Sequence, residues 1–328
     1  MSDLPSLVRI NEEGPREGFQ LEGAGVPTDR KIELIDRLSE TGLKQIQIVS
    51  FVNPKRVPGM ADAGEVVGRY RRHPNVRYTA LWLNDQGFNR ALATNRLDLG
   101  GRIVLCASPA FLKRNANMTL DENIASHRKQ IRNYLDKGLT VTHGGLQAAF
   151  GCNFEGDISL HQLLSTASDV FKLASEFGLK LKTFVLADTM AWANPTSVHR
   201  SVVAFRNKFP DVEVILHLHD TRGLGVANAL AGLQVGVANF DTAVGGLGGC
   251  PFAAHKGAAG NLCTEDFVFM CHEMGLETGI DLDALIDAAR LAQDIIGHPL
   301  PGCVMQGGNL GTLRQSAKAA KSEASAVS

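Results

Sequence analysis

Short, continuously apolar runs alternate with longer amphipathic stretches along this chain. Continuous apolar runs are typical of parallel strands buried on both faces, whereas an apolar stripe that recurs every three to four residues is typical of a helix. On this basis we predict eight strands, at Leu7–Asn11, Leu43–Val49, Arg77–Leu83, Arg102–Cys106, Leu139–Thr142, Leu181–Ala187, Val212–Leu218 and Phe240–Val244.

The amphipathic stretches fall between these runs and predict the helices. One of them begins with a clear signal, because Thr119 stands three residues before Glu122, which is the spacing of a capping box. The predicted helices are Thr28–Glu40, Thr119–Lys137, Leu160–Phe177, Ser197–Lys208, Val226–Val237, Thr264–Met274 and Asp281–Ile296.

Eight strands with intervening helices over about 270 residues are typical of a closed (β/α)₈ barrel. Periodicity does not show closure, so a doubly wound open sheet is the alternative. We predict an α/β fold: a TIM barrel with a short C-terminal helical extension. The catalytic barrel domain with its last helix would span residues 1–296. Residues 297–328 would form the extension and end in an Ala/Ser/Lys-rich tail that we expect to be mobile.

Composition and charge exclude several classes of protein. The chain has 328 residues, 44% of them hydrophobic, and a formal net charge of −1, unlike a disordered chain or a basic nucleic-acid binder. No run reaches the roughly 18 apolar residues of a membrane span, and Met1–Pro5 lacks the features of a secretory signal. The six cysteines show no Cys-x-x-Cys spacing and indicate free thiols. We expect a cytoplasmic enzyme with neither nucleic-acid nor membrane partners.

Two histidines stand at the end of an apolar strand, in the sequence His217-Leu218-His219-Asp220. Because residues i and i+2 of a strand point to the same face, both imidazoles can reach one ion. Completed by a carboxylate, such a pair suits Mn²⁺, Mg²⁺ or Zn²⁺. The alternative is one structural and one solvent-facing histidine.

Two glycine-containing segments follow the first and the eighth predicted strand, where a barrel places its catalytic groups. The turn Gly14–Gly18 holds Arg16 and Glu17, a cation beside a candidate oxygen ligand. The loop Gly245–Gly249 is able to open and close as a lid and ends at Cys250. The alternatives are an ordinary surface ion pair and a flexible turn with an inert thiol.

Taken together, these motifs resemble the 3-hydroxy-3-methylglutaryl-CoA (HMG-CoA) lyase family, within the DRE-TIM metallolyase superfamily. The resemblance runs from about Val8 to Leu285. Beyond the motifs above, it includes Ser50-Phe51-Val52-Asn53-Pro54-Lys55, Phe111-Leu112-Lys113-Arg114-Asn115, Gly151-Cys152, Ala187-Asp188-Thr189 and Gly260-Asn261-Leu262-x-Thr264-Glu265-Asp266.

The resemblance implies a metal-binding carbon–carbon lyase. Its cofactor would be one divalent cation, Mg²⁺ or Mn²⁺ in preference to Zn²⁺, held by Glu17, His217, His219 and Asn261. The implied reaction is a retro-aldol (Claisen-type) cleavage of a 3-hydroxyacyl-CoA, such as HMG-CoA, to acetyl-CoA and a keto acid. A cation that lowers the pKa of the C3 hydroxyl favours loss of its proton, and that loss drives C2–C3 cleavage.

The same resemblance implies the catalytic residues. Arg16 would stabilise the negative charge that develops on the thioester oxygen. Asp188 is the candidate base for the C3 hydroxyl, with His217 as a candidate relay. Cys250 would protonate the enolate carbon.

Substrate contacts are expected from residues around this centre. Lys113 and Arg114 are candidates for the CoA phosphates, with a solvated basic pair as the alternative, and Asn84 is a candidate for a hydrogen bond to the substrate. Gln47 and Arg222 are expected near the substrate too. Because the net charge is near zero, an anionic CoA ester has to be held by local groups such as these.

The chain departs from the family pattern at the predicted catalytic face. Glu17 stands where the family has Asp, which moves the ion by up to roughly an ångström or changes how the carboxylate binds it. Gln47 replaces a Glu and loses a charge near the metal, and Arg222 replaces an aromatic residue. The loop between Cys250 and Asn261 is two residues longer. We infer a divergent member whose acyl group need not be 3-hydroxy-3-methylglutaryl.

The alternatives therefore include a related lyase that acts on citramalyl-CoA or a similar ester. A second alternative is a Claisen condensing enzyme of the isopropylmalate synthase type, and the short region after the barrel argues against it. A third is a non-catalytic protein that binds acyl-CoA or a metal. A homodimer is the expectation that comes with the family.

Overall fold

The computed structural model describes residues 4–22, 25–249, 260–311 and 313–318. Eight strands form one all-parallel sheet, in the order β3-β2-β1-β10-β9-β8-β5-β4. They are β1 (Arg9–Glu12), β2 (Gln45–Ser50), β3 (Arg77–Leu81), β4 (Gly101–Cys106), β5 (Val141–Gln147), β8 (Thr183–Ala187), β9 (Glu213–His217) and β10 (Asn239–Thr242). A short antiparallel hairpin is formed by β6 (Gly151–Cys152) and β7 (Gly156–Asp157).

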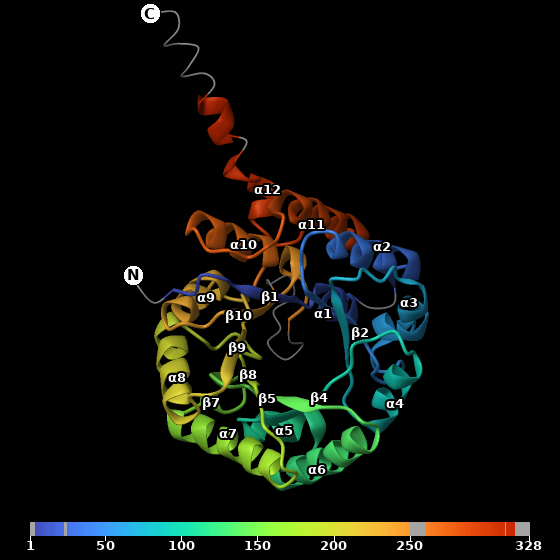
Figure 1. The fold of residues 1–328 in the computed structure, drawn as a ribbon, viewed down its shortest axis with the longest axis vertical. Helices are drawn as coiled ribbons and strands as arrows, with labels where there is room; N and C mark the ends of the chain where they lie inside the picture. The colour runs from blue at the N-terminus through green and yellow to red at the C-terminus, as the bar shows by residue number, and fades with distance from the viewer. Residues whose placement is uncertain (1–3, 23–24, 250–259, 312, 319–328) are drawn as a thin grey trace, which may run out of the picture.

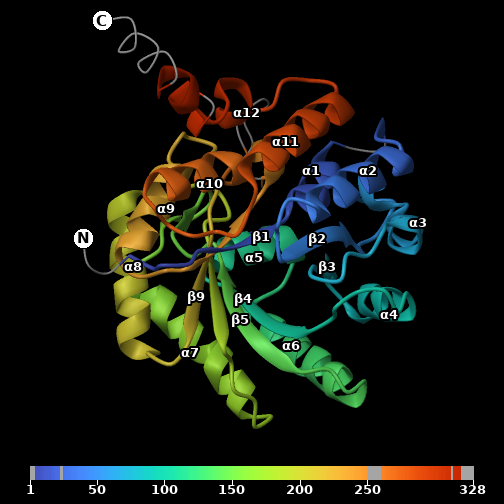
Figure 2. The same ribbon diagram turned by 45° about the horizontal axis from the view of Figure 1, so that its top comes forward.

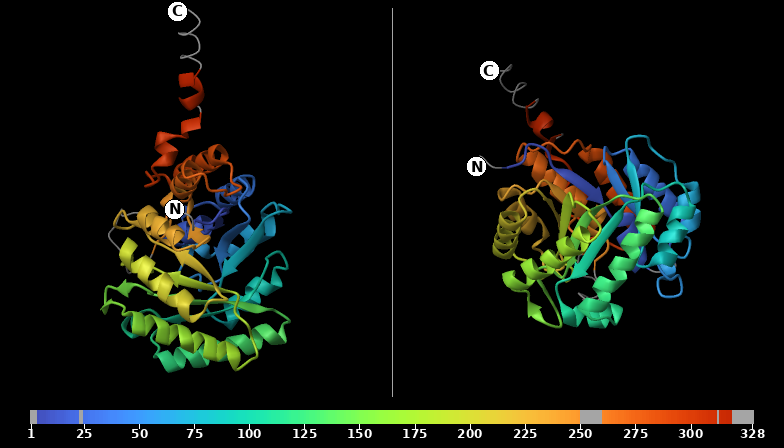
Figure 3. Two further views of the ribbon diagram at one scale, coloured as in Figure 1. Left: turned by 60° about the vertical axis from the view of Figure 1, so that its left-hand side comes forward. Right: turned by 60° about the horizontal axis from the view of Figure 1, so that its bottom comes forward.

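Most of the helices form a ring around the strands, whereas α1 and α5 lie on its inner side in this view (Figure 1). They are α1 (Gly14–Leu21), α2 (Thr28–Ser39), α3 (Ala63–Arg69), α4 (Asp85–Ala93), α5 (Pro109–Ala116), α6 (Leu120–Asp136), α7 (Leu160–Ser175), α8 (Pro195–Lys208), α9 (Gly225–Gln234), α10 (Thr264–Glu273), α11 (Leu282–Ile296) and α12 (Val304–Gly307). Two 3₁₀ turns, η2 (Pro58–Met60) and η3 (Val244–Gly246), lie between them. α11 packs against α2 and α10, and α12 continues beyond it (Figures 2 and 3).

The two ends of the sheet, β3 and β4, meet through side chains. Nη2 of Arg102, in β4, donates to the carbonyl oxygen of Trp82, directly after β3, at 3.3 Å. The Arg102 guanidinium also lies over the Trp82 indole, 5.5 Å from its centroid. The sheet is therefore curled into a barrel with its seam between β3 and β4, which confirms the predicted (β/α)₈ fold.

All eight predicted strands are present, with ends shifted by a few residues. The largest shift is in β5, which continues to Gln147, whereas the apolar pattern stops at Thr142. Gly144 and Gly145 interrupt that pattern, but here they serve close packing: a Cβ on Gly144 would lie 2.8 Å from the ring of Phe184 in the neighbouring strand. Glycine is required at this position because the strands approach so closely.

The seven predicted helices are also confirmed, including the capping box between Thr119 and Glu122. The turn predicted at Gly14–Gly18 is wrong, because these residues begin the helix α1. Pro15 occupies the first helical turn, where its fixed φ suits a helix and its missing N–H costs no hydrogen bond. Among the described residues, no helix is long and apolar enough to cross a membrane.

Candidate active site

Three ligand-type side chains converge at the carboxyl ends of β1 and β9. Glu17 lies on α1, which follows β1, while His217 is the last residue of β9 and His219 follows shortly after. Oε1 of Glu17 lies 3.8 Å from Nε2 of His217, and Oε2 of Glu17 lies 4.0 Å from Nε2 of His219. One ligand atom from each residue lies within 4.8 Å of the other two, so a single ion can contact all three.

Asn261 lies beside these side chains, where its backbone pairs with that of His219. Its Nδ2 donates to Oε2 of Glu17 at 2.6 Å and to the carbonyl oxygen of Leu247 at 2.9 Å. Its Oδ1 is buried and has no hydrogen-bond partner among the described residues. We call Glu17, His219, Asn261 and the Nε2 edge of His217 the ligand side of the site.

The ligand side has the chemistry of a cation site. Nδ1 of His219 lies 2.7 Å from the carbonyl oxygen of Asp188, so Nδ1 carries the proton and Nε2 presents a lone pair. Within the part of the chain that the structure describes, that Nε2 is buried without a partner, as is Oδ1 of Asn261. Buried acceptors without a donor are costly, and a divalent cation between them and the Glu17 carboxylate would satisfy them. The predicted ligands therefore fit a metal.

The opposite edge of His217 faces two carboxyl groups. Oδ2 of Asp241, in β10, lies 3.3 Å from Nδ1 of His217, and its Oδ1 accepts from Nδ2 of Asn11 at 2.9 Å. Oε2 of Glu13 lies 3.9 Å from the same Nδ1. Nε2 of Gln47 donates to Oε1 of Glu13 at 3.2 Å. We call Glu13, Gln47 and Asp241 the support side, and on it the acceptor oxygens are occupied.

These charges shift one another's pKa values. Burial alone would lower the pKa of His217, but the hydrogen bond to Asp241 and the carboxylates of Glu17 and Glu13 raise it to about 9. Burial would raise the pKa of Glu17, but Arg16 and the two histidines hold it well below its ordinary value. The Glu17 carboxylate is therefore ionised and suited to a cation. Because metals bind neutral imidazole, cation binding at His217 would release a proton.

Arg16 lies between the two sides of the site and is mostly buried. Its Nη1 lies 2.6 Å from Oε1 of Glu17, its Nε donates to Oε1 of Gln47 at 2.5 Å, and its Nη2 donates to Oε2 of Glu13. A guanidinium has five N–H donors, and these three contacts leave two of them for a ligand.

Asp188 follows β8 and is 1% exposed. Its Oδ1 accepts from the backbone N–H groups of Trp192 (2.7 Å) and Ala193 (3.0 Å), which fixes the carboxyl, while its Oδ2 is buried without a partner. Burial raises the pKa of Asp188 to about 6, with the two site histidines and these backbone hydrogen bonds opposing the rise. Such a carboxyl group is suited to accept a proton near neutral pH.

Two further buried carboxyl groups hold the backbone around the glycine-rich loop. Glu12 accepts from the backbone N–H groups of Gly14 (2.7 Å) and Val244 (2.9 Å), and Glu265 accepts from that of Gly245 (3.0 Å). Burial raises the pKa of each to about 7. These contacts tie α1 and η3, the two segments that flank the ligand side, to the barrel core.

The glycine-rich loop touches the ligand side. Gly248 has φ of +83°, and a Cβ there would lie 2.5 Å from Nδ2 of Asn261 and 2.5 Å from Cβ of Glu17. Glycine is therefore required for both backbone conformation and space. Cys250, predicted to protonate the enolate, lies outside the described residues.

Four other predicted substrate contacts come from the segments that follow β3, β4 and β9. Asn84 caps α4, and its Oδ1 accepts from the backbone N–H of Gly87 at 2.9 Å. Lys113 and Arg114 are exposed on α5, where Arg114 lies over the ring of Phe154. Arg222 is exposed after β9, and its Nη1 donates to carbonyl oxygens in the loop after β8, those of Met190 (3.2 Å) and Ala191 (3.0 Å).

Glu13 and Asp241 were not predicted from the sequence. A signal for Asp241 was available, because a charged residue in the middle of a buried strand needs a partner. Glu13 had the weaker signal of two adjacent glutamates, Glu12 and Glu13, at the end of the first strand.

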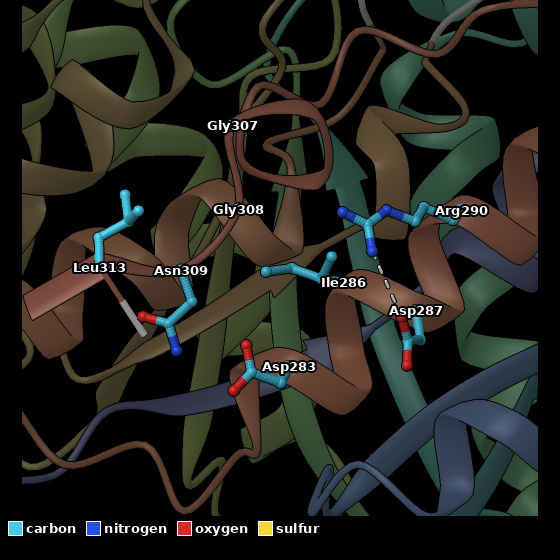
Figure 4. A pocket seen from close by; sticks show the side chains of 8 residues that line it. All are labelled: Asp283, Ile286, Asp287, Arg290, Gly307, Gly308, Asn309 and Leu313. Carbon is cyan, nitrogen blue, oxygen red and sulfur yellow. Dashed lines mark hydrogen bonds and ion pairs between the residues drawn. The ribbon is translucent and has the colours of Figure 1, made fainter. Parts of the chain in front are cut away.

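Two other features stand apart from this centre. Cys263, Glu265 and Asp266 form a third cluster with metal-ligand spacing, but both Asp266 oxygens accept backbone N–H groups, from Cys303 (3.0 Å) and Val304 (2.7 Å). A surface hollow of about 340 Å³ lies between α11 and the segment after α12 (Figure 4). Arg290 faces Asp287 in it, and none of the ligand-side or support-side residues line it.

The chain matches known proteins along most of its length. The family model described as HMGL-like matches residues 7–292. The chain is 37% identical over 302 residues to hydroxymethylglutaryl-CoA lyase YngG of Bacillus subtilis, covering 92% of this chain and 97% of that protein. It is 37% identical over 288 residues to the cytoplasmic 3-hydroxy-3-methylglutaryl-CoA lyase of Homo sapiens, covering 88% of this chain and 75% of that protein.

Solved structures agree with the sequence matches. The HMG-CoA lyase of Bacillus subtilis has a TM-score of 0.84 and 34% identity, and the alignment covers 92% of this chain and 98% of that one. An HMG-CoA lyase from Acinetobacter baumannii, in complex with coenzyme A and 3-methylmalate, has a TM-score of 0.83 and 39% identity, with 95% and 98% covered.

Proposed function

The chain belongs to the HMGL-like family, and from this premise we propose that it is a divalent-cation-dependent carbon–carbon lyase that cleaves a 3-hydroxyacyl-CoA. One observation carries the proposal: Nε2 of His219, a buried acceptor with no partner among the described residues, lies with the Glu17 carboxylate and His217 within reach of one ion. Asn261, whose Oδ1 is likewise buried without such a partner, contacts the same carboxylate through Nδ2. This donor set is the one expected for Mg²⁺ or Mn²⁺, since it combines carboxylate and amide oxygens with imidazole.

A cation held by these residues would lower the pKa of the substrate hydroxyl and orient its oxygen. Asp188 then takes the proton of the C3 hydroxyl on its unpartnered Oδ2. As the C3–O bond becomes a carbonyl, the C2–C3 bond breaks and its electron pair moves into the enolate of the departing acyl-CoA. Arg16, with its two remaining N–H donors, stabilises the negative charge on the thioester oxygen.

The enolate carbon must then gain a proton to give the free acyl-CoA. We assign this step to Cys250, which follows the glycine-rich loop beside the ligand side. A donor carried by this loop would meet the substrate when the loop covers the site, which also excludes water.

For the substrate we propose HMG-CoA or a related 3-hydroxyacyl-CoA. The Acinetobacter baumannii relative binds coenzyme A and 3-methylmalate, which supports a CoA thioester of a small hydroxy acid. Lys113 and Arg114 are the candidate contacts for the CoA phosphates, because both are exposed on α5. Asn84, Gln47 and Arg222 are the candidate contacts for the rest of the substrate.

The assay is a panel of CoA thioesters that contains HMG-CoA, citramalyl-CoA and 3-methylmalyl-CoA. Purified protein is incubated with Mn²⁺ or Mg²⁺, and released acyl-CoA is identified by mass spectrometry, with and without EDTA. We expect EDTA-sensitive release of acetyl-CoA or a homologous acyl-CoA from one member. If no member is cleaved, the proposed function is wrong. If instead acetyl-CoA and a 2-keto acid release free CoA, the protein is a condensing enzyme.

We also propose that the protein acts as a cytoplasmic homodimer. The homodimer is the expectation that comes with the family, and the cytoplasmic location is that named for the Homo sapiens relative. Sedimentation equilibrium would give the mass of a dimer of 35.2 kDa chains.

A further inference from the structure

Arg16, Glu13 and Gln47 form a closed ring of three side chains. Nη2 of Arg16 donates to Oε2 of Glu13, Nε2 of Gln47 donates to Oε1 of Glu13 at 3.2 Å, and Nε of Arg16 donates to Oε1 of Gln47 at 2.5 Å. Each member therefore contacts the other two. Glu13 and Gln47 are 8% exposed, so the ring is shielded from solvent.

The ring contains one carboxyl group and one carboxamide, and their places can be exchanged. With Gln at position 13 and Glu at position 47, the new carboxylate would accept from Nε of Arg16 and from the new amide, whose oxygen would accept from Nη2 of Arg16. All three hydrogen bonds and the net charge would be kept. Two carboxylates, by contrast, would repel each other across 3.2 Å, and two amides would leave Arg16 with Glu17 as its carboxylate partner.

The combination of two amides, at positions 13 and 47, matters because Glu17 belongs to the ligand side. Arg16 already contacts Oε1 of Glu17 at 2.6 Å. A guanidinium without Glu13 would be drawn toward Glu17 and would compete with a cation for its carboxylate. Oε2 of Glu13 also lies 3.9 Å from Nδ1 of His217, so the same carboxyl group acts on a second ligand.

We propose that Glu13 is a positioning residue of the lyase site: with Gln47 as its neutral partner, it holds Arg16 for the thioester oxygen and keeps Arg16 from pairing with Glu17 beyond the one contact made by Nη1. The family has a Glu where this chain has Gln47. Glu13, which is hydrogen-bonded to Gln47, thus supplies the negative charge that Gln47 lacks. This inference rests on the proposed function for its catalytic consequence. Its effect on Glu17 and on cation binding does not require knowledge of the substrate.

The test is a cycle of four proteins: the natural chain, Glu13→Gln, Gln47→Glu and the double variant E13Q/Q47E. We expect each single variant to lose about 10- to 100-fold in Mn²⁺ affinity and in kcat, the range seen when a partner of a metal ligand is removed. KM should change little. The double variant should recover to within about fivefold of the natural protein, which is the coupling that a contacting pair shows in such a cycle.

Three readouts are recorded for each protein: Mn²⁺ affinity by calorimetric titration, kcat and KM on the cleaved thioester, and the thermal midpoint without cation. The matched control is Glu40→Gln, which removes an exposed carboxylate paired with Arg71 on the surface. It should leave all three readouts unchanged.

The outcomes separate the inference from the function it rests on. If the natural protein cleaves no thioester, the proposed function fails, and the Mn²⁺ affinities still decide the role of Glu13. If Glu13→Gln has the Mn²⁺ affinity and kcat of the natural protein, or if the double variant stays as low as the singles, the inference is overturned. Should Glu13→Gln fail to fold, loss in Gln47→Glu with recovery in the double variant supports it, and no recovery overturns it.

Discussion

The two edges of His217 meet opposite surroundings. On the ligand side, Nε2 of His219 and Oδ1 of Asn261 are buried acceptors without a donor. On the support side, the carboxyl oxygens of Glu13 and Asp241 accept from Arg16, Gln47 and Asn11 or face Nδ1 of His217.

The difference supports the ligand side, with the Glu17 carboxylate, as the proposed cation site. Three groups of side chains in the described residues have metal-ligand spacing, and spacing alone does not rank them. Hydrogen-bond satisfaction separates the two groups that share His217, because a buried acceptor without a donor calls for an explanation and a bound cation is one. The support side orients His217 and raises its pKa. We propose that the cation binds on the ligand side.

The largest loss of Mn²⁺ affinity and kcat is expected when a ligand-side acceptor is removed. His219→Ala should lower Mn²⁺ affinity and kcat by more than about 100-fold, beyond the range for supporting residues, since it deletes a ligand outright. EDTA should abolish the activity of the natural protein, and added Mn²⁺ should restore it. Calorimetric titration and the thioester assay measure both effects.

The control for this variant is His199→Ala, an exposed histidine on α8. It should bind Mn²⁺ as the natural protein does. Unchanged Mn²⁺ binding in His219→Ala would place the cation elsewhere.

A support-side change should have a smaller effect. Asp241→Asn keeps the size of the side chain but removes the carboxylate that accepts from Nδ1 of His217. We expect Mn²⁺ affinity to fall by about 10- to 100-fold while the fold is kept. Asp287→Asn on the surface of α11 is the matched control. A loss as large as that of His219→Ala would show that the two sides do not differ as argued.

A smaller change still is expected from Glu17→Asp, which shortens the ligand carboxylate by one methylene and keeps its charge. Mn²⁺ affinity should change by less than about tenfold, because the ligand type is retained. The ratio of kcat/KM between HMG-CoA and the other thioesters should change, because the cation that orients the hydroxyl moves. An unchanged ratio would rule out Glu17 as a determinant of substrate choice.

The smallest effect on Mn²⁺ binding is expected from Glu12→Gln, which lies outside both sides and acts on stability. Burial raises the pKa of Glu12 from 4.5 to about 7, so the folded state holds this proton more tightly than the unfolded chain. The free energy of unfolding therefore falls as the pH rises from about 4.5 to about 7, by up to about 3 kcal/mol for this group.

Gln cannot ionise, so the gain from Glu12→Gln should grow with pH across that window. Urea unfolding of both proteins between pH 4.5 and pH 8 measures it. A stability difference that does not vary with pH would show that the Glu12 pKa is not raised.

Much of the fold could be predicted because its strands are continuously apolar. β9 and the helix with the Thr119 capping box were both visible in the pattern. The predicted β5 ended too early because Gly144 and Gly145 interrupt the apolar pattern of the sequence. In the fold these glycines allow the neighbouring strand to approach closely. α1 was missed for a similar reason, since Gly14 and Pro15 are as common in turns as in a first helical turn.

The proposed ligand set came from the His217-x-His219 spacing and the family resemblance, and the structure brings Glu17, His217 and His219 together, with Asn261 beside them. The support side could not be predicted. Glu13 and Asp241 gain their roles from partners far along the chain, Gln47 and His217, and no local pattern reports such contacts.

The central claim is that the cation binds on the ligand side of His217. Anomalous diffraction from crystals soaked in MnCl₂ tests it directly. We predict one strong peak within about 2.5 Å of ligand atoms of Glu17, His217, His219 and Asn261, the distance expected for such ligands. A peak between Glu13 and Asp241, a peak at Cys263, Glu265 and Asp266, or no peak on the ligand side would contradict the account.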